Sequence, residues 1–220
     1  PGNRPPDFAT VGTMLARRGV TGVTEISPTN DRQIARHFAR ESDAGRLPQQ
    51  IVLAGRRELT MADMAGRMRI GPVKVHLHHD HLPPFEGFVR DIRLAHDAGR
   101  AVAVHCVSEV ELVYTLAALG EAGSGAGDRI EHASIAPDTA IDEIARLGLA
   151  VVSQPHFIAE RGDAYLTDVA ATDHPLLYRQ RAFVDAGVTL AAGSDAPFGT
   201  ADPWASMAAA VARTTAAGIC

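Results

Sequence analysis

The chain has 220 residues, 46% hydrophobic and 21% charged, with a formal net charge of -5, which predicts one globular domain over residues 1–220. No apolar run is long enough for a membrane span, and no signal peptide opens the chain. The basic residues come in pairs without interleaved aromatics, which argues against nucleic acid as a partner. Two cysteines without Cys-x-x-Cys spacing favour a reducing cytoplasm and exclude a four-cysteine zinc site. Since there is no initiator Met, we expect a fragment of a longer protein.

The apolar patterns predict an alternating α/β fold. A helical pattern near residues 7–18 comes first, and helical patterns also follow nearly all of the seven apolar runs behind it. The order favours a TIM-like (β/α)8 barrel that is incomplete, with strands 2 to 8 present and the first strand missing. A doubly wound open sheet is the alternative. The seven strands are expected near residues 20–25, 50–54, 72–77, 101–105, 129–132, 149–153 and 188–192.

Glycines end four of the predicted helices, and a β-branched apolar run begins directly after each one. Glycine suits a left-handed helix cap because it has no Cβ to clash at positive φ. These four glycines are Gly19, Gly99, Gly148 and Gly187. Ser108 and Glu111 have the spacing of a capping box, which predicts a helix from about residue 109 to 119.

A stretch of about twenty residues, from Pro155 to Pro175, shows no clear periodicity and is expected to be a loop. In a barrel this loop would lie on the active-site face. His156, Arg161 and Tyr165 are candidate substrate contacts there, although an ordinary surface loop would look similar.

Four ionisable residues lie at or near the ends of predicted strands, where a barrel places its chemistry: Lys74, His105, His132 and Asp195. Each has a structural alternative. The histidines could be hydrogen-bonded core residues, the lysine could extend its amine to the strand end, and the aspartate could cap a helix. The joint pattern favours a metal site. Imidazole and carboxylate bind zinc, iron and manganese, a metal lowers the pKa of water to about 7, and a neutral buried amine can add CO2 to form a metal-binding carbamate.

Six short motifs follow one another between residues 73 and 203, within a longer stretch of similarity to one family from about residue 18 to 214. They are Val73-Lys74, Val104-His105, Arg129-Ile130-Glu131-His132-Ala133, Ser153-Gln154-Pro155, Gly193-Ser194-Asp195-Ala196-Pro197 and Asp202-Pro203. The ordered set resembles the amidohydrolase superfamily and is most similar to its amidohydrolase family 3, the N-substituted formamide deformylase-like branch.

The resemblance implies one or two divalent metal ions, with zinc as the expected metal. It implies that Lys74 carries a CO2-derived carbamate that bridges the metals, and that His105 and His132 are metal ligands. Asp195 would bind metal and carry the proton from the attacking water to the leaving group. Such acid–base catalysis is worth roughly 10²- to 10⁴-fold in rate.

The family's His-x-His pair on the first strand and its small β-sandwich are not found in this chain, which puts the activity of this piece alone in question. His76 and His78 have the pair's spacing, but they lie beside Lys74 with only four predicted strands after them. Together with His79 and His81 they form either a solvated loop or a cluster of which one member lines the pocket. Cys106, next to His105, is expected to point to the opposite face as a small buried residue.

The sequence therefore predicts a metal-dependent hydrolase in which metal-activated hydroxide attacks a non-peptide C–N bond of a small molecule, an amide or formamide. The alternative is a catalytically incomplete metal-binding or structural barrel fragment. An isomerase or decarboxylase on the same metal site is a third reading, since one fold supports many reactions.

Overall fold

The computed structural model describes residues 8–219; residue 7, the predicted start of the first helix, and Cys220 lie outside the described residues. The chain divides into two compact units, one up to Val75 and one from His76. The boundary falls inside strand β3. The prediction that residues 1–220 form one domain stays a prediction.

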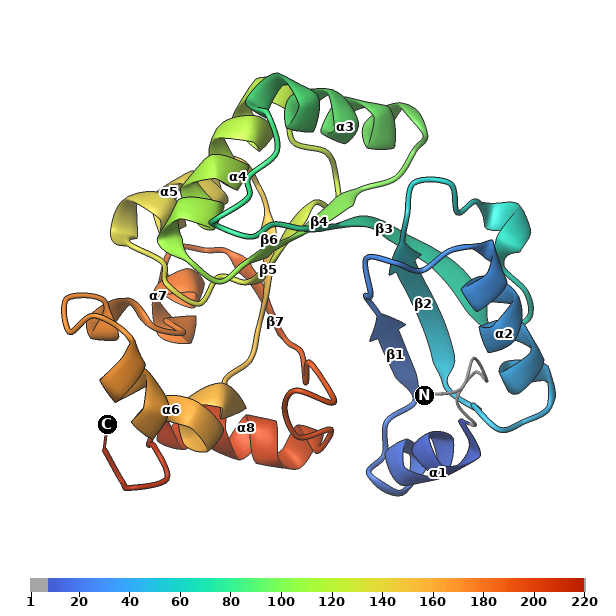
Figure 1. The fold of residues 1–220 in the computed structure, drawn as a ribbon. Helices are drawn as coiled ribbons and strands as arrows, with labels where there is room; N and C mark the ends of the chain where they lie inside the picture. Colours follow the sequence, from blue (N-terminus) through green and yellow to red (C-terminus); the bar gives the residue numbers. More distant parts are fainter. Residues whose placement is uncertain (1–7, 220) are drawn as a thin grey trace. The chain divides into compact units, whose positions relative to one another are not determined.

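The seven strands are neighbours in chain order, β1-β2-β3-β4-β5-β6-β7 (Figure 1). Each pair whose register is defined is parallel. A doubly wound sheet would reverse its strand order at a switch point, and this order never reverses. The structure thus confirms the predicted incomplete TIM-like (β/α)8 fold.

In the unit up to Val75, the described residues 8–75 form three strands and two α-helices. Its elements are α1 (Ala9–Arg17), β1 (Gly22–Glu25), α2 (Arg32–Asp43), β2 (Gln50–Gly55), the 3-10 helix η1 (Met61–Asp63) and the larger part of β3 (Met68–His76). Ile51 and Leu53 of β2 are fully buried, and Phe38 of α2 belongs to the same apolar cluster. Burial of one face of α2 against β2 therefore forms the core of this unit.

Strand β3 begins earlier than the predicted 72–77. Leu53 pairs with Ile70, whereas Gly55, two residues later, pairs with Val73, so β3 carries one extra residue at this point. Pro72 lies within this irregularity. Because proline has no N–H for the strand ladder, a bulge is where a sheet tolerates it. The strand continues across the proline instead of starting there.

The unit from His76 contains β4 to β7 and most of the helices. Its elements are α3 (Phe85–Asp97), β4 (Val102–Cys106), α4 (Glu109–Ala122), β5 (Arg129–His132), α5 (Asp138–Arg146), β6 (Ala150–Ser153), α6 (His156–Asp168), η2 (His174–Leu176), α7 (Gln180–Asp185), β7 (Thr189–Ala192) and α8 (Pro203–Ala212). Helices α3, α4, α5 and α7 pack in a row, and α6 packs on α8. Within residues 8–219, no helix has the length and apolar character needed to cross a membrane.

The predicted helix ends are confirmed. Ser108 and Glu111 form the capping box at the start of α4, which runs three residues beyond the predicted end. The four capping glycines all have φ between 66° and 78°, a region that only glycine enters without steric cost. Local residue chemistry therefore set these boundaries.

The prediction of a long irregular loop from Pro155 to Pro175 is wrong, because α6 occupies most of this stretch. The inward face of α6 includes His156 and Gly162, both buried, and neither counts as apolar in a periodicity search. A Cβ at Gly162 would come within 2.5 Å of the Thr215 side chain, so close packing explains the glycine. Because buried positions of α6 carry a histidine and a glycine instead of apolar residues, the sequence shows no clear helical periodicity here.

Glu41 of α2 forms a bidentate ion pair with Arg46. The Arg46 Nε and Nη2 atoms each donate to a Glu41 carboxylate oxygen at 2.7 Å. These hydrogen bonds lower the pKa of Glu41 from 4.5 to about 2. A carboxylate held in this way stabilises the folded chain at every pH at which the carboxylate is ionised.

We expect Glu41→Gln to destabilise the protein at neutral pH, with the deficit shrinking as the pH falls. The folded pKa lies below the unfolded one, so the stabilisation is complete above pH 4.5 and is lost between pH 4.5 and about 2. Urea unfolding of wild type and variant across this range measures the difference, with the exposed Glu109→Gln as the control. A deficit that stays constant from pH 7 to pH 2 would contradict the pKa assignment.

Candidate metal and catalytic site

Parallel pairing aligns the carboxyl ends of β4 to β7 at one edge of the sheet. Cys106 is in register with His132, and Ser153 is in register with Ala192. The residues that end these strands, and the loops that follow them, therefore share one edge, which is where barrel enzymes carry their active sites.

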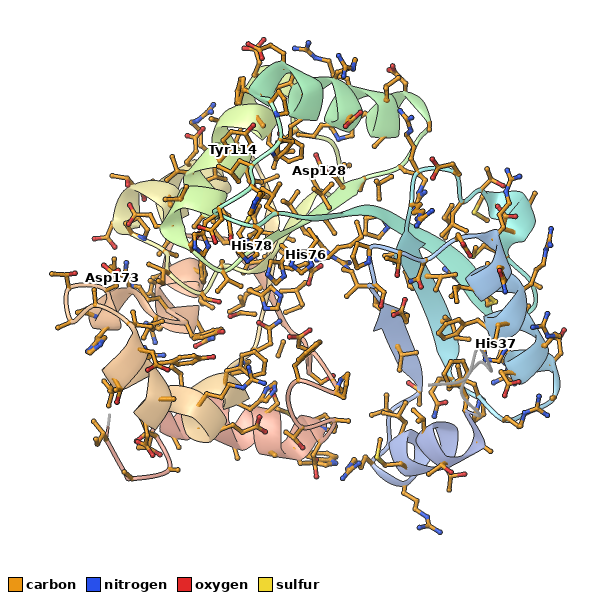
Figure 2. All side chains as sticks on the ribbon, in the orientation of Figure 1. His37, His76, His78, Tyr114, Asp128 and Asp173 are labelled. Carbon is orange, nitrogen blue, oxygen red and sulfur yellow. The ribbon has the colours of Figure 1, made fainter. Side chains whose placement is uncertain are left out.

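Three histidine rings lie in a row at this edge. The ring of His105 stacks on that of His76 with 4.1 Å between centroids, and meets that of His132 edge-on at 4.3 Å. His132 is buried, His105 is half-buried and His76, labelled in Figure 2, is exposed. The two predicted ligands are therefore neighbours, and His76 contacts one of them.

The hydrogen bonds of Gln154 define which ring nitrogen of His132 carries a proton. Gln154 Nε2 donates to the carbonyl of Val152 at 3.4 Å, and its Oε1 faces His132 Nδ1 at 2.8 Å. Since Oε1 only accepts, Nδ1 is the donor. In the neutral ring the lone pair is therefore on Nε2, which is the atom that would bind a metal. Metal-binding histidines commonly donate their other N–H in this way.

Left-handed backbone occurs at two of the predicted site residues. His132 has φ 73° and Asp195 has φ 49°, and Ala133 follows His132 with φ 48°. Such conformations cost non-glycine residues about 1–3 kcal/mol each and are concentrated at functional sites. The backbone therefore adopts left-handed conformations at His132, where β5 ends, and at Asp195, in the loop after β7. Both are residues that the sequence predicted to be functional.

The loops after β3 and β4 share one buried carboxylate, that of Glu111. It accepts the backbone N–H groups of Val107 at 2.7 Å, Ser108 at 3.1 Å and His79 at 2.9 Å. Cys106 is fully buried, and its Sγ atom lies 3.3 Å from Thr115 Oγ1 on α4. The expectation that Cys106 is a small buried residue is confirmed.

The remaining histidines of the cluster after β3 are exposed. The rings of His78 and His79 stack at 4.9 Å between centroids, and both lie near Asp80, at 3.6 and 3.3 Å. The cluster thus divides into His76, which ends β3 and contacts His105, and His78, His79 and His81 in the loop after it.

The predicted substrate contacts lie on α6. His156 is buried, and both of its ring nitrogens are within hydrogen-bond distance of protein atoms, Ser206 Oγ and the Ser194 carbonyl. Tyr165 is half-buried and stacks on Tyr178, and burial raises the pKa of the Tyr178 hydroxyl. Substrate contact by His156 or Tyr165 stays a prediction.

Lys74 lies on β3 in the unit up to Val75. Its side chain is buried, with 8% of the residue exposed. It is also the only lysine among the 21 basic side chains of the chain, and the other 20 are arginines. A guanidinium cannot lose its proton in proteins, whereas an amine can, so Lys74 is the one basic side chain of this sequence that could carry a carbamate.

The donor set of the second unit fits a divalent metal in chemical type. Two imidazoles at adjacent strand ends, one with Nε2 as its lone-pair nitrogen, are ligands that zinc and similar ions bind. In the part of the chain that the structure describes, no three His, Cys, Asp or Glu side chains form a group that could hold a metal by themselves. Asp195 is half-buried in the loop after β7.

Gln154 is the site residue that the sequence reasoning left without a role. It occurs in the Ser153-Gln154-Pro155 motif, but its function depends on a partner 22 residues away in the sequence. In the sequence, the one indication of a function for Gln154 is its place directly after the predicted strand of residues 149–153.

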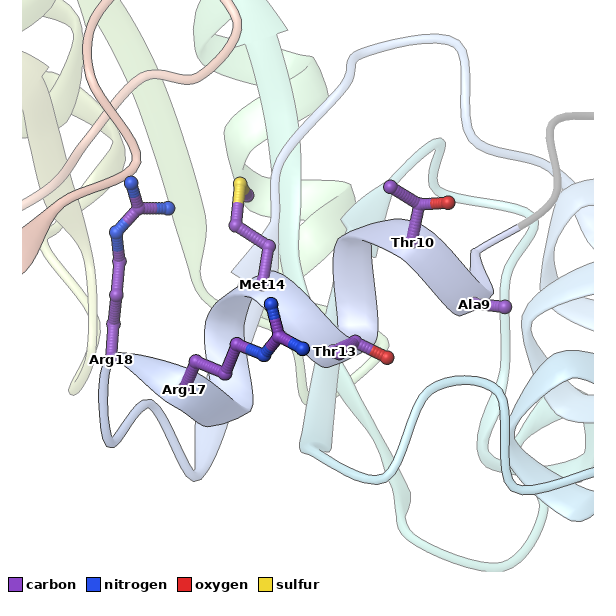
Figure 3. Close-up of a pocket in the computed structure, with 6 residues that line it drawn as sticks. All are labelled: Ala9, Thr10, Thr13, Met14, Arg17 and Arg18. Carbon is purple, nitrogen blue, oxygen red and sulfur yellow. The ribbon is translucent and has the colours of Figure 1, made fainter.

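A surface hollow in the first unit contains none of the predicted site residues. It runs along α1 and is lined by Ala9, Thr10, Thr13, Met14, Arg17 and Arg18 (Figure 3).

Solved structures with this fold include metal-dependent hydrolases. An uncharacterized one from Pyrococcus horikoshii OT3 aligns with a TM-score of 0.81 and 21% identity, covering 96% of this chain and 48% of that one. A second, from Pyrococcus furiosus, aligns with a TM-score of 0.77 and 24% identity, covering 91% and 48%. At these identities the likeness shows the fold alone.

The sequence profile of the amidohydrolase family matches residues 15–219, and the chain belongs to this family. YtcJ of Bacillus subtilis (strain 168), a candidate amidohydrolase, is 29% identical over 141 residues, 63% of this chain and 26% of YtcJ. The N-substituted formamide deformylase of Arthrobacter pascens is 36% identical over 91 residues, 41% of this chain and 17% of the deformylase. The chain thus spans about a quarter or less of the length of these relatives.

We expect Gln154→Leu to weaken metal binding by about 10- to 100-fold, because His132 loses the acceptor that orients its ring. Isothermal titration calorimetry of the metal-free protein with Zn²⁺ measures the affinity. Gln180→Leu is the matched control, since Gln180 Nε2 donates to Ser153 Oγ at the same sheet edge without contacting a predicted ligand. Equal affinities for Gln154→Leu and wild type would show that the hydrogen bond does not serve a metal ligand.

Proposed function

We propose that this chain is the metal-binding part of a hydrolase that cleaves non-peptide C–N bonds of small molecules. The observation that carries the proposal is the pairing of His105 with His132 at adjacent strand ends, with Nε2 of His132 as the lone-pair nitrogen. Membership of the amidohydrolase family and the fold shared with metal-dependent hydrolases support it.

Each predicted residue has a distinct task in this proposal. His105 and His132 bind a divalent ion, with zinc the first choice, through ring nitrogens. Lys74 is buried and is the one lysine of this sequence. Its amine adds CO2 and contributes a carbamate oxygen as a ligand. Asp195 accepts a proton from the attacking water at its carboxylate and passes it to the leaving nitrogen. The metal, when bound, lowers the pKa of water and polarises the substrate carbonyl.

An amide or a formamide is the proposed substrate class. One relative in sequence is named for deformylation of N-substituted formamides, and its similarity spans 91 residues of this chain. In both compounds, the carbonyl carbon of the C–N bond is attacked, and the nitrogen must be protonated as it leaves. A proton carrier such as Asp195 is what this departure requires.

A catalytically incomplete metal-binding module is the second candidate. It is favoured by the lack of any group of three His, Cys, Asp or Glu metal ligands within residues 8–219. The two candidates differ in whether the natural full-length protein turns over an amide.

In the full-length protein, we expect Lys74→Arg to abolish the carbamate and reduce metal content, because a guanidinium keeps its charge but cannot add CO2. Carbon-13 NMR in ¹³C-bicarbonate buffer detects the carbamate, and elemental analysis counts the metal. Asp195→Asn is the matched variant. It should keep the carbamate signal and lower kcat by about 10²- to 10⁴-fold, which is the usual contribution of acid–base catalysis.

A carbamate signal that survives in Lys74→Arg would refute the role of Lys74. Wild-type turnover by Asp195→Asn would refute the proton-transfer role. A full-length protein that binds metal but hydrolyses no amide or formamide would favour the non-catalytic module.

A further inference from the structure

The loop between β7 and α8, residues 193–202, carries Asp195 and is held by side chains of α6. The Arg161 guanidinium donates to the carbonyl of Phe198 and lies 4.4 Å above the Phe157 ring. Glu160 Oε1 accepts the backbone N–H of Thr200 at 3.2 Å. These contacts attach the far part of the loop to the surface of α6.

His156 makes the buried contact of this set, next to the predicted proton carrier. It is 1% exposed, and its Nε2 lies 3.1 Å from the Ser194 carbonyl oxygen. Its Nδ1 lies 3.2 Å from Ser206 Oγ on α8. Because a carbonyl only accepts, Nε2 is the donor, and in the neutral ring Nδ1 accepts from the Ser206 hydroxyl.

The Ser194 carbonyl belongs to the same planar peptide unit as the N–H of Asp195. A hydrogen bond that fixes this plane also restricts the backbone rotation φ of Asp195. That φ is 49°, a left-handed value that a non-glycine residue keeps only where its surroundings enforce it. His156 supplies such a constraint from a different element of the fold.

The loop is packed against His156 with little spare room. A Cβ placed on Gly199 would come within 2.4 Å of His156 Nε2 and 2.6 Å of Phe157 Cε1. The amides of Phe198 and Gly199 both donate to the Asp195 carbonyl, at 2.8 and 3.3 Å. The turn that presents Asp195 therefore closes on the imidazole ring.

We propose that His156 is a positioning residue that sets the orientation of Asp195 through the Ser194–Asp195 peptide, and that it does not bind substrate. The engagement of both ring nitrogens by protein atoms supports this role over a substrate contact. The inference rests on the proposed function, because positioning matters for turnover only if Asp195 is catalytic.

Two substitutions of His156 in the full-length protein separate its two hydrogen bonds. The amide of His156→Gln reaches the position of Nε2 and keeps a donor for the Ser194 carbonyl. The shorter amide of His156→Asn reaches the position of Nδ1 and keeps only the Ser206 contact. Ser206→Ala is the matched control, since it removes the α8 side of the same bridge and leaves the Ser194 bond.

Hydrogen exchange at the amides of Phe198 and Gly199 is the first readout, because it reports the turn independently of activity. We expect faster exchange in His156→Asn than in wild type, with His156→Gln and Ser206→Ala close to wild type. Exchange that is unchanged in His156→Asn, or equally fast in all three variants, would overturn the inference.

Steady-state kinetics on an amide substrate is the second readout. We expect His156→Asn to lower kcat by about 10²-fold at constant KM, as misplacement of a reacting group does, and His156→Gln to recover most of that loss. A rise in KM at unchanged kcat would identify a substrate contact and overturn the positioning role. If wild type hydrolyses no amide or formamide, the proposed function fails, while hydrogen exchange still decides whether His156 holds the turn.

Discussion

Parallel pairing of strands that each lead into a helix is the constraint on which the candidate site depends. It brings the ends of β4, β5, β6 and β7 to one edge of the sheet, although they are far apart in the sequence. The side chains at the ends of these strands can then lie close together. His105 and His132 are neighbours because their strands are neighbours.

Two predicted site residues at this edge have a strained backbone, and a hydrogen bond from another element lies at or next to each of them. His132 and Asp195 are both left-handed, each at a cost of about 1–3 kcal/mol. Gln154 holds the ring of the first, and His156 holds the peptide before the second. Each left-handed residue thus has a hydrogen bond from another element at its side chain or at the peptide before it, which is the arrangement expected of a preorganised site.

Helix α6 links these features to the fold. It packs on α8, and three of its side chains contact the loop that carries Asp195. A segment that was predicted to be an irregular loop is thus a helix that supports the loop after β7. Its sequence shows no clear period because a histidine and a glycine occupy inward positions for reasons of contact, and neither is counted as apolar.

The sequence by itself determined the order of the strands, the order of the helices apart from α6, four helix ends and the residue types at strand ends. These depend on local chemistry: glycine at caps, the Ser108 and Glu111 capping box, and the apolar run that ends in His105. Only the tertiary structure decided the proton position on His132, the bulge at Pro72 and the hydrogen bonds of His156. The reason is distance along the chain, since the partners of His132 and His156 lie 22 to 50 residues away.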